Sequence, residues 1–346
     1  MFNKKYYKIP LDKFINSALY DPKKGYYMRT IPFGKQGDFV TSPNISNIFS
    51  EMIFIWIISY WKKFYKNKKI NVIELCAGNG EMLHQIIKSA KNFNFFFDNC
   101  NFFIYEKSQK LKLIQKTKLK NNKVKWLKDF KKLDNYPSIF IGNEFLDALP
   151  IKQFENIKNN WYEKYVLKNG KKFSFTKEKS NIRKIEKKLK LNVSKNQNFL
   201  EISLEIIKII KQLSKIICKK GGCILFIDYA YLNNKMLDTL QAVRKHKTVN
   251  VLKNVGRSDI SHVINIPFLK KIAKKSGLDL KYVSQREFLL NLGILQRAEI
   301  LSSKKSFLEK ANIYYRVNRL IDKKQMGELF KVIYFHNKNN FNIGFK

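Results

Sequence analysis

The order of apolar and polar residues predicts a helical N-terminal segment. Apolar residues of 11–20 recur every three or four positions, as they do on one face of a helix. A glycine-rich segment at 25–42 follows and predicts an irregular loop. Between 45 and 64 the apolar spacing of three and four returns, which indicates a long amphipathic helix. Ser42 and Pro43 fit its N-cap and its first helical position.

Beyond residue 70 the pattern changes to short apolar runs that alternate with helical segments. Strands are expected at 70–75, 101–106, 123–127 and 138–143, and helices at 81–91 and 108–120. Short buried strands that alternate with helices are typical of a parallel sheet with helices on both faces. We therefore expect an α/β, doubly wound, Rossmann-like sheet.

The second half of the chain predicts an insertion and a cap. Residues 151–176 alternate in hydrophobicity with turn residues between them, which predicts an antiparallel hairpin or meander. Further elements are expected as a helix at about 200–219 and strands at 221–230, 280–285 and 330–336, with mostly helical or irregular segments at 232–275 and 286–325. The expected units are N-terminal helices with a lid loop at 1–69, the core with its insertion at 70–231, and cap segments with late strands at 232–346.

Composition excludes a disordered chain and leaves the meaning of the charge open. With 346 residues and 45% hydrophobic residues the chain can bury a large core. Its longest apolar stretch, 52–61, is too short to span a bilayer, and no signal-peptide run opens the chain, so we expect a soluble cytoplasmic protein. The net charge of +41 suggests nucleic acid or an anionic membrane surface, but it comes from 60 Lys and only 8 Arg spread along the chain. That distribution favours a compositional bias of the surface and makes a nucleic-acid partner less expected.

Cysteines and histidines show no metal-binding spacing. The four cysteines and four histidines are scattered, and no pair of them completes a zinc motif. The sequence also has no P-loop and no nucleophile elbow. We therefore expect reduced thiols and no metal site.

Two carboxylates close the first two strands of the expected sheet. Glu74 ends the first strand and Glu106 ends the second. An acid at the end of the second strand can accept hydrogen bonds from the ribose hydroxyls of an adenosine. The loop after Glu74 is CAGNG, which lacks the triple-glycine cradle for a pyrophosphate. S-adenosylmethionine (SAM), a cation with a ribose and no phosphate, fits these residues better than NAD.

The stretch GNEFLDALP, at 142–150, closes the fourth expected strand. It places Asn143, Glu144 and Asp147 where a methyl acceptor would meet SAM. The chain has no Pro-Pro pair, whereas nucleic-acid amine methyltransferases typically carry a Pro-Pro-aromatic motif here. Two carboxylates favour a cationic acceptor, and their structural alternative is a helix-capping Asp beside an exposed Glu.

Several motifs together resemble the MidA family of class I SAM-dependent methyltransferases, which includes the mitochondrial complex I assembly methyltransferase. They are LYDPKKGYYMR, FGKQGDFVTSPNISNIFSE, ELCAGNGEML, NEFLDALPIKQF, DTLQAVRKH and MGELFKV, in the family's order from about residue 11 to 335. The family's SAM loop normally reads ELGPGRG, and this chain departs from it at Cys76, Ala77 and Asn79. Ala230 stands where Gly is usual, and the His of DISHVIN is displaced by one position.

The resemblance implies symmetric dimethylation of an arginine in a core subunit of respiratory complex I. Glu144 and Asp147 would then be catalytic, by gripping the guanidinium and receiving its proton. The expected cofactor-binding residues are Glu74, Gly78, Gly80, Glu106, Asn143, Gly37 and Ser42. Segment 25–42 is expected to fold over the site as a lid, or alternatively to pack as an ordered loop. Rival hypotheses are an RNA or small-molecule methyltransferase and a non-catalytic assembly chaperone, and the oligomeric state stays open.

Overall fold

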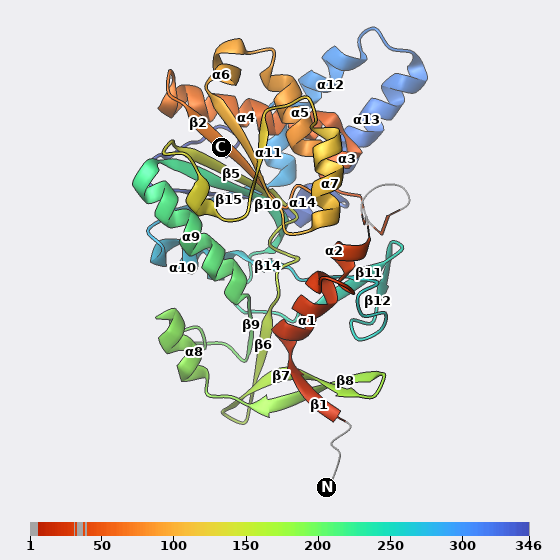
Figure 1. Cartoon of the computed structure of the whole chain (residues 1–346), viewed down its shortest axis with the longest axis vertical. Coiled ribbons are helices and arrows are strands. Elements are labelled where there is room, and N and C mark those ends of the chain that lie inside the picture. The colour runs from red at the N-terminus through yellow and green to blue at the C-terminus, as the bar shows by residue number, and fades with distance from the viewer. Residues whose placement is uncertain (1–5, 31, 33–36, 39, 346) are drawn as a thin grey trace.

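A central sheet organises the computed structural model, which describes residues 6–30, 32, 37–38 and 40–345 (Figure 1). Its strand order is β4-β3-β2-β5-β10-β16-β15, and a short β14 pairs with β10. The strands are β2 (Ile70–Leu75), β3 (Cys100–Tyr105), β4 (Val124–Leu127), β5 (Ser138–Asn143), β10 (Gly222–Tyr231), β14 (Ile264–Asn265), β15 (Asp279–Ser284) and β16 (Phe330–His336). β16 runs antiparallel to both of its neighbours, and the other pairs are parallel. The predicted doubly wound sheet is confirmed.

Helices cover both faces of this sheet, so its central strands are apolar on both sides. Adjacent residues of β2 show this, because Val72 belongs to an apolar cluster with residues of the helices at 47–65 and 81–90, and Ile73 belongs to another with residues of the helices at 204–220 and 266–275. The helices of the core are α4 (Asn47–Tyr65), α5 (Glu81–Ala90), α6 (Asn94–Asp98), α7 (Gln109–Lys118), α9 (Leu204–Lys220) and α10 (Ile266–Lys275), with a 3₁₀ turn at Phe130–Lys132. The central strands are thereby packed between two helical layers.

The long helix expected from residue 45 is interrupted at Ser46. α3 (Ser42–Ile45) ends there, and α4 begins at Asn47 with the Ser46 hydroxyl accepting a hydrogen bond from the Ile48 N–H at 3.3 Å. A serine side chain that caps a new helix competes with continuation of the previous one. The predictions of Ser42 as N-cap and Pro43 as first helical position are wrong, because Thr41 is the N-cap of α3 and Ser42 is its first residue.

A second, antiparallel sheet forms from the insertion and the N-terminus. It contains β1 (Tyr6–Pro10), β6 (Lys152–Ile157), β7 (Asn160–Asn169), β8 (Lys172–Lys179) and β9 (Phe199–Ile202), and α8 (Ile182–Leu189) follows β8. β1 pairs with β7, so chain segments about 160 residues apart in sequence share one ladder. The helix expected from about 200 starts at Leu204, because the residues before it pair with β6 and the Ser203 hydroxyl caps the helix.

A third, small sheet contradicts the helical or irregular structure expected at 232–275. β11 (Gln241–Arg244) pairs with β12 (Lys247–Val249) and with β13 (Asp259–Ser261). Lys245 and His246 connect β11 to β12 with φ of +49° and +60°, the backbone of a tight two-residue hairpin. Helices do form in the later cap segment, as α11 (Gln285–Asn291), α12 (Ile294–Ser302), α13 (Phe307–Ile321) and α14 (Met326–Leu329).

The N-terminal helices join this small sheet to the core. α1 (Leu11–Tyr20) packs against β13 and β7 through an apolar cluster that includes Leu11, Phe14 and Ile260. Figure 1 shows α1 and α2 (Tyr26–Arg29) beside β11 and β12. None of the described helices is both long and apolar enough to span a membrane. The expected unit boundaries at 69 and 231 stay a prediction.

Candidate active site

The carboxyl ends of β2, β3 and β5 open into a cavity of about 300 Å³. β2 pairs with β3 on one side and β5 on the other, so the strand order reverses at this point. Ligands of doubly wound sheets bind where that reversal opens a crevice. Residues of α2, β11 and β13 close the opposite wall. The cavity therefore lies between the core sheet and the small sheet.

The loop after β2 has a left-handed backbone at three positions. Cys76, Gly78 and Gly80 have φ of +54°, +52° and +78°. The Cys76 N–H donates to the Tyr105 carbonyl at 2.8 Å, and the Gly78 carbonyl accepts from Gln115 Nε2 at 2.9 Å. These hydrogen bonds fix the backbone of the loop, and Gly78 lies on the cavity wall.

Glu74 and Glu106 are buried acids on the same wall. One Glu74 oxygen accepts from the Leu83 N–H at 3.1 Å, and burial raises the pKa of Glu74 to about 8. Glu106 accepts from the Ser108 N–H at 2.9 Å and from Gln115 Nε2 at 3.3 Å. Burial also raises the pKa of Glu106, while the Ser108 N–H opposes that rise.

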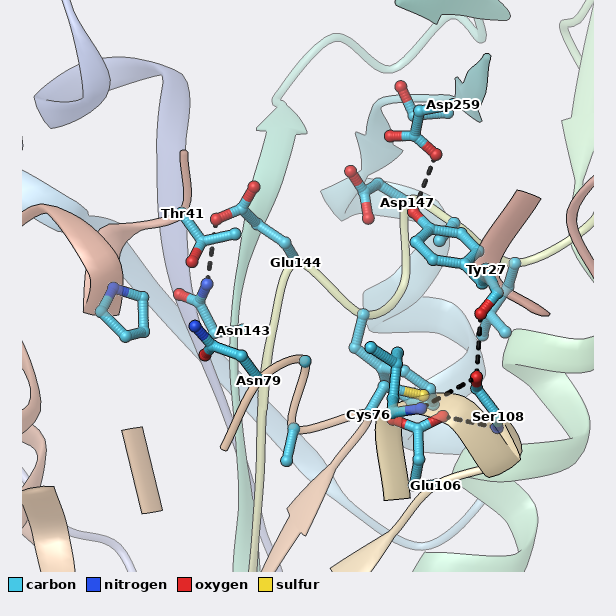
Figure 2. Close-up of a pocket in the computed structure, with 18 of the residues that line it drawn as sticks. Tyr27, Thr41, Cys76, Asn79, Glu106, Ser108, Asn143, Glu144, Asp147 and Asp259 are labelled. Carbon is cyan, nitrogen blue, oxygen red and sulfur yellow. Dashed lines mark hydrogen bonds between the residues drawn. The ribbon is translucent and has the colours of Figure 1, made fainter. Parts of the chain in front are cut away.

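Asn143 and Glu144 close β5 on the other side of the cavity (Figure 2). Asn143 Nδ2 donates to a Glu144 oxygen at 3.0 Å. Glu144 has a φ of +51°, an unusual conformation for a side chain with a Cβ and one that is typical of functional positions. Burial, followed by the negative charge of Asp228, raises the pKa of Glu144 to about 8, while the Asn143 side chain and then the backbone N–H of Ser42 oppose that rise.

The loop at 145–147 is held by a buried carboxylate of β10. Asp228 Oδ2 accepts from the backbone N–H groups of Phe145, Leu146 and Asp147 at 3.1, 2.7 and 3.3 Å. Asp228 is fully buried, and burial raises its pKa to about 7. Three donors on one oxygen fix the turn that aims the Asp147 side chain into the cavity.

A third acid faces this turn from the small sheet. Asp259 Oδ1 accepts from the Tyr27 hydroxyl at 2.7 Å, and Figure 2 shows Asp147 on the same side of the cavity. Burial raises the pKa of Asp259 to about 6. Burial, followed by the charges of Asp228 and Asp259, raises the pKa of Asp147 well above its ordinary value. A cation placed among Glu144, Asp147 and Asp259 would relieve this repulsion.

The residues present fit SAM. Asn143 Oδ1 is buried on the cavity wall and has no hydrogen-bond partner among the described residues, so it can accept a ligand N–H or O–H. Glu106 can accept from ribose hydroxyls, and the nearby acids suit a ligand with an ammonium and a sulfonium. Within the described ranges, no three His, Cys, Asp or Glu side chains are grouped to hold a metal ion.

Residues 52–284 match the model of a family of S-adenosyl-L-methionine-dependent methyltransferases, which is about two thirds of the chain. The chain belongs to this family. It is 29% identical to the mitochondrial protein arginine methyltransferase NDUFAF7 of Xenopus laevis, over 93% of this chain and 80% of that protein. The human protein of the same name is 27% identical over 93% of this chain and 78% of its own length. The predicted family resemblance is confirmed.

The fold of this methyltransferase also matches a solved structure. A Burkholderia thailandensis protein described as a likely methyl transferase, bound to S-adenosyl-homocysteine, superposes with a TM-score of 0.82. It is 23% identical and covers 97% of this chain and 90% of its own. The expected SAM cofactor and enzyme class are confirmed by the family match. The expected cytoplasmic location is wrong, because the relatives that cover nine tenths of the methyltransferase are named as mitochondrial proteins.

Most of the predicted site residues meet in the cavity of the methyltransferase. Those that line it are Glu74, Gly78, Glu106, Asn143, Glu144 and Asp147. Their cofactor and acceptor contacts stay a prediction. The alternative for residues 144 and 147 was a helix-capping Asp beside an exposed Glu. It does not describe the structure, because Asp228 accepts the backbone hydrogen bonds of this turn and Asp147 is buried.

Three of the predicted cofactor-binding residues do not line the cavity. Gly80 is the N-cap of α5, and an added Cβ there would lie 3.4 Å from Gln115 Cγ, so its role is in the turn. The Ser42 side chain is fully buried and donates to Gln285 Oε1 at 3.3 Å, away from the cavity, while its backbone N–H faces Glu144. Gly37 precedes the wall residue Asp38 without lining the wall itself.

The expected lid is described only in part. Residues 31, 33–36 and 39 of segment 25–42 lie outside the described residues. The described part contains α2 and brings Tyr27, Asp38 and Thr41 to the cavity wall. Closure of this segment over a bound cofactor stays a prediction.

Sequence reasoning missed Asp228, Asp259 and Tyr27. Asp228 carried the same signal as Glu74, an acid near the carboxyl end of a buried strand. Asp259 and Tyr27 carried no such signal, because they come from β13 and α2, which approach the core only in the folded chain.

Proposed function

We propose that this methyltransferase transfers methyl groups from SAM to the guanidinium of a protein arginine. The observation that carries the proposal is that three carboxylates, Glu144, Asp147 and Asp259, line the same cavity, two from the chain after β5 and one from the small sheet. Three acids at an acceptor position favour a cationic substrate and oppose a phosphate-bearing one. The curated relatives named as protein arginine methyltransferases support the same substrate class.

The cofactor would lie along the ends of β2 and β3. When bound, SAM supplies an electrophilic methyl group. Glu106 would accept hydrogen bonds from the ribose hydroxyls, and Gly78 would allow backbone to approach the methionine part. Glu74 would orient the loop or the ammonium group, and the unpartnered Asn143 oxygen would accept one further N–H.

Glu144 and Asp147 would prepare the acceptor. A guanidinium stays protonated at neutral pH because its pKa lies above about 12, so it is a poor nucleophile. Two carboxylates would bind its N–H groups and favour a lone pair on the nitrogen nearest the methyl group. Positioning of two reactants can lower a barrier by roughly 7–11 kcal/mol. Burial raises the pKa of Glu144 to about 8, and a guanidinium bound beside it would lower that pKa and ionise the carboxyl. The Glu144 carboxylate would then take up the proton that the nitrogen releases.

The protein substrate that we propose is a core subunit of respiratory complex I, with symmetric dimethylarginine as the product and complex I assembly as the process supported. Support comes from the family resemblance of the motifs and from relatives named as mitochondrial proteins. The large positive charge of the chain would favour an acidic surface on that partner.

The test is methyl transfer from radiolabelled SAM to recombinant complex I core subunits, followed by mass spectrometry of the product. Label on one arginine, lost when that arginine is replaced by lysine, is the expected result. Glu144→Gln serves as the inactive enzyme control, provided that it still binds SAM. Transfer to RNA or to a small amine, with none to any subunit, would contradict the proposed substrate and leave only the methyltransferase assignment.

A further inference from the structure

We propose that Tyr27 is a positioning residue that couples Glu106, the acid expected to bind ribose, to the acceptor acids, so that each ligand strengthens binding of the other. The inference rests on the proposed function for the identity of the acceptor. The coupling itself does not depend on the proposed function, because the contacts that would transmit it lie within the chain.

One end of the connection reaches the acid expected to bind ribose. The Tyr27 carbonyl accepts a hydrogen bond from the Ser108 hydroxyl at 2.8 Å. The Ser108 N–H donates to Glu106 at 2.9 Å, and the Ser108 hydroxyl also caps α7 by accepting from the Leu111 N–H at 3.3 Å. Ser108 is buried, so its orientation is fixed by these three contacts. A ligand that engages Glu106 would therefore act on the backbone of Tyr27 through one residue.

The other end of the connection reaches the acceptor side. The Tyr27 hydroxyl donates to Asp259 at 2.7 Å, as the dashed line in Figure 2 shows. The Tyr27 ring stacks on Tyr20, with centroids 5.7 Å apart and planes 20° apart. The Tyr20 hydroxyl donates to the Ala148 carbonyl at 2.9 Å, next to Asp147. Tyr27 is thus held to both walls of the acceptor site.

α2 depends on tertiary contacts for its position, among them the burial of the Tyr26 ring in the apolar cluster with α1. It is four residues long, and a helix of one turn is not stable by itself. Its tertiary hydrogen bonds include the two of Tyr27, one from Lys110 to the Arg29 carbonyl and one from Tyr26 to Asp38. When one ligand orders such an element, the second ligand binds to an element that is already ordered and binds more tightly. This is the physical basis of the proposed coupling.

The test compares Tyr27→Phe with Tyr26→Phe. Tyr27→Phe removes the hydroxyl bond to Asp259 and keeps the ring and the carbonyl contact with Ser108. Tyr26→Phe is the matched control, because the neighbouring hydroxyl also donates to a carboxylate, Asp38, at 2.6 Å but makes no bond to Asp259. Calorimetry would give the affinity of each protein for S-adenosyl-homocysteine, and hydrogen exchange would follow the peptide at 258–265 with and without that ligand.

In the wild type and in Tyr26→Phe, S-adenosyl-homocysteine should slow amide exchange at 258–265. In Tyr27→Phe this protection should disappear while the affinity for S-adenosyl-homocysteine changes by less than about threefold, because the Ser108 contact remains. Protection at 258–265 that survives in Tyr27→Phe would overturn the proposal. Equal loss in both variants would also overturn it, since the effect would then reflect general loosening of α2.

A second measurement involves the acceptor. The affinity of an arginine peptide from the methylated subunit should rise at least about fivefold when S-adenosyl-homocysteine is present, and this ratio should fall to about one in Tyr27→Phe. An unchanged ratio in the variant would contradict the coupling. Failure of the wild type to bind any arginine peptide would overturn the proposed function instead, and the exchange experiment would still decide whether Tyr27 couples the two walls.

Discussion

Glu144→Gln tests the acceptor side of the cavity most directly. The substitution keeps the shape of the side chain and its capacity to accept from Asn143 Nδ2, but it removes the charge and the basicity. General-base catalysis contributes typically 10²–10⁴-fold to rates, so methyl transfer should fall by roughly that factor. SAM affinity should stay within about threefold of the wild type, because Glu106 and the loop after β2 are unchanged.

The same substitution should change the pH dependence of stability. Burial raises the pKa of Glu144 from its ordinary value of 4.5 to about 8. Between these values the folded protein holds a proton that the unfolded chain has lost, so the stability of the wild type falls as pH rises. Each pKa unit corresponds to about 1.4 kcal/mol, which gives a contribution of roughly 3–5 kcal/mol across that range. Glutamine does not titrate, so the stability of Glu144→Gln should not show this fall with rising pH.

Thermal unfolding would measure the difference. An unfolding entropy of about 2 cal/mol/K per residue gives roughly 0.7 kcal/mol/K for this chain, so the Tm of Glu144→Gln relative to wild type should rise by about 4–7 °C between pH 5 and pH 8.5. Glu155→Gln, on the exposed face of β6, is the control and should show no such rise. A Tm difference between variant and wild type that does not change with pH would refute the assigned environment of Glu144. Full methyl transfer by a variant that binds SAM normally would refute its assigned role.

Three further substitutions test other parts of the site. Glu106→Ala should weaken SAM binding roughly ten- to a hundredfold in calorimetric titration, because hydrogen bonds to charged groups contribute about 1.5–3 kcal/mol, and an unchanged Kd would reduce Glu106 to a structural acid. Cys76→Gly should relieve about 1–2 kcal/mol of left-handed strain against a glycine entropy cost of about 0.5–1 kcal/mol, so urea unfolding should show slight stabilisation, and a large loss would instead indicate a packed or functional thiol. Asp228→Ala should leave three buried N–H groups without an acceptor and lower the free energy of unfolding by at least about 3 kcal/mol, whereas a loss below about 1 kcal/mol would show that the turn at 145–147 is held by other contacts.

The sequence by itself determined the core sheet and the acids at its edge. Short apolar runs separated by helices can bury both faces only as a parallel sheet between two helical layers, and β2, β3 and β5 form where the runs predict them. Because the carboxyl ends of parallel strands meet at one edge, Glu74, Glu106 and Glu144 were predictable as neighbours from their positions alone. Each of these strands is a short contiguous apolar run, so its pattern of apolar residues is visible in the sequence.

Only the tertiary structure decided which distant segments complete the site. Tyr27 and Asp259 are 232 residues apart in sequence, and no periodicity relates them. β11 and β13 are strands of four and three residues, too short for a hydrophobic pattern to identify, and they pair across a stretch of chain that includes β12. Ser42 carried a capping signal, but packing turned its side chain toward Gln285 and left its backbone to face Glu144. Side-chain direction and long-range pairing follow from which apolar surfaces are buried against one another, and a local sequence pattern does not contain that information.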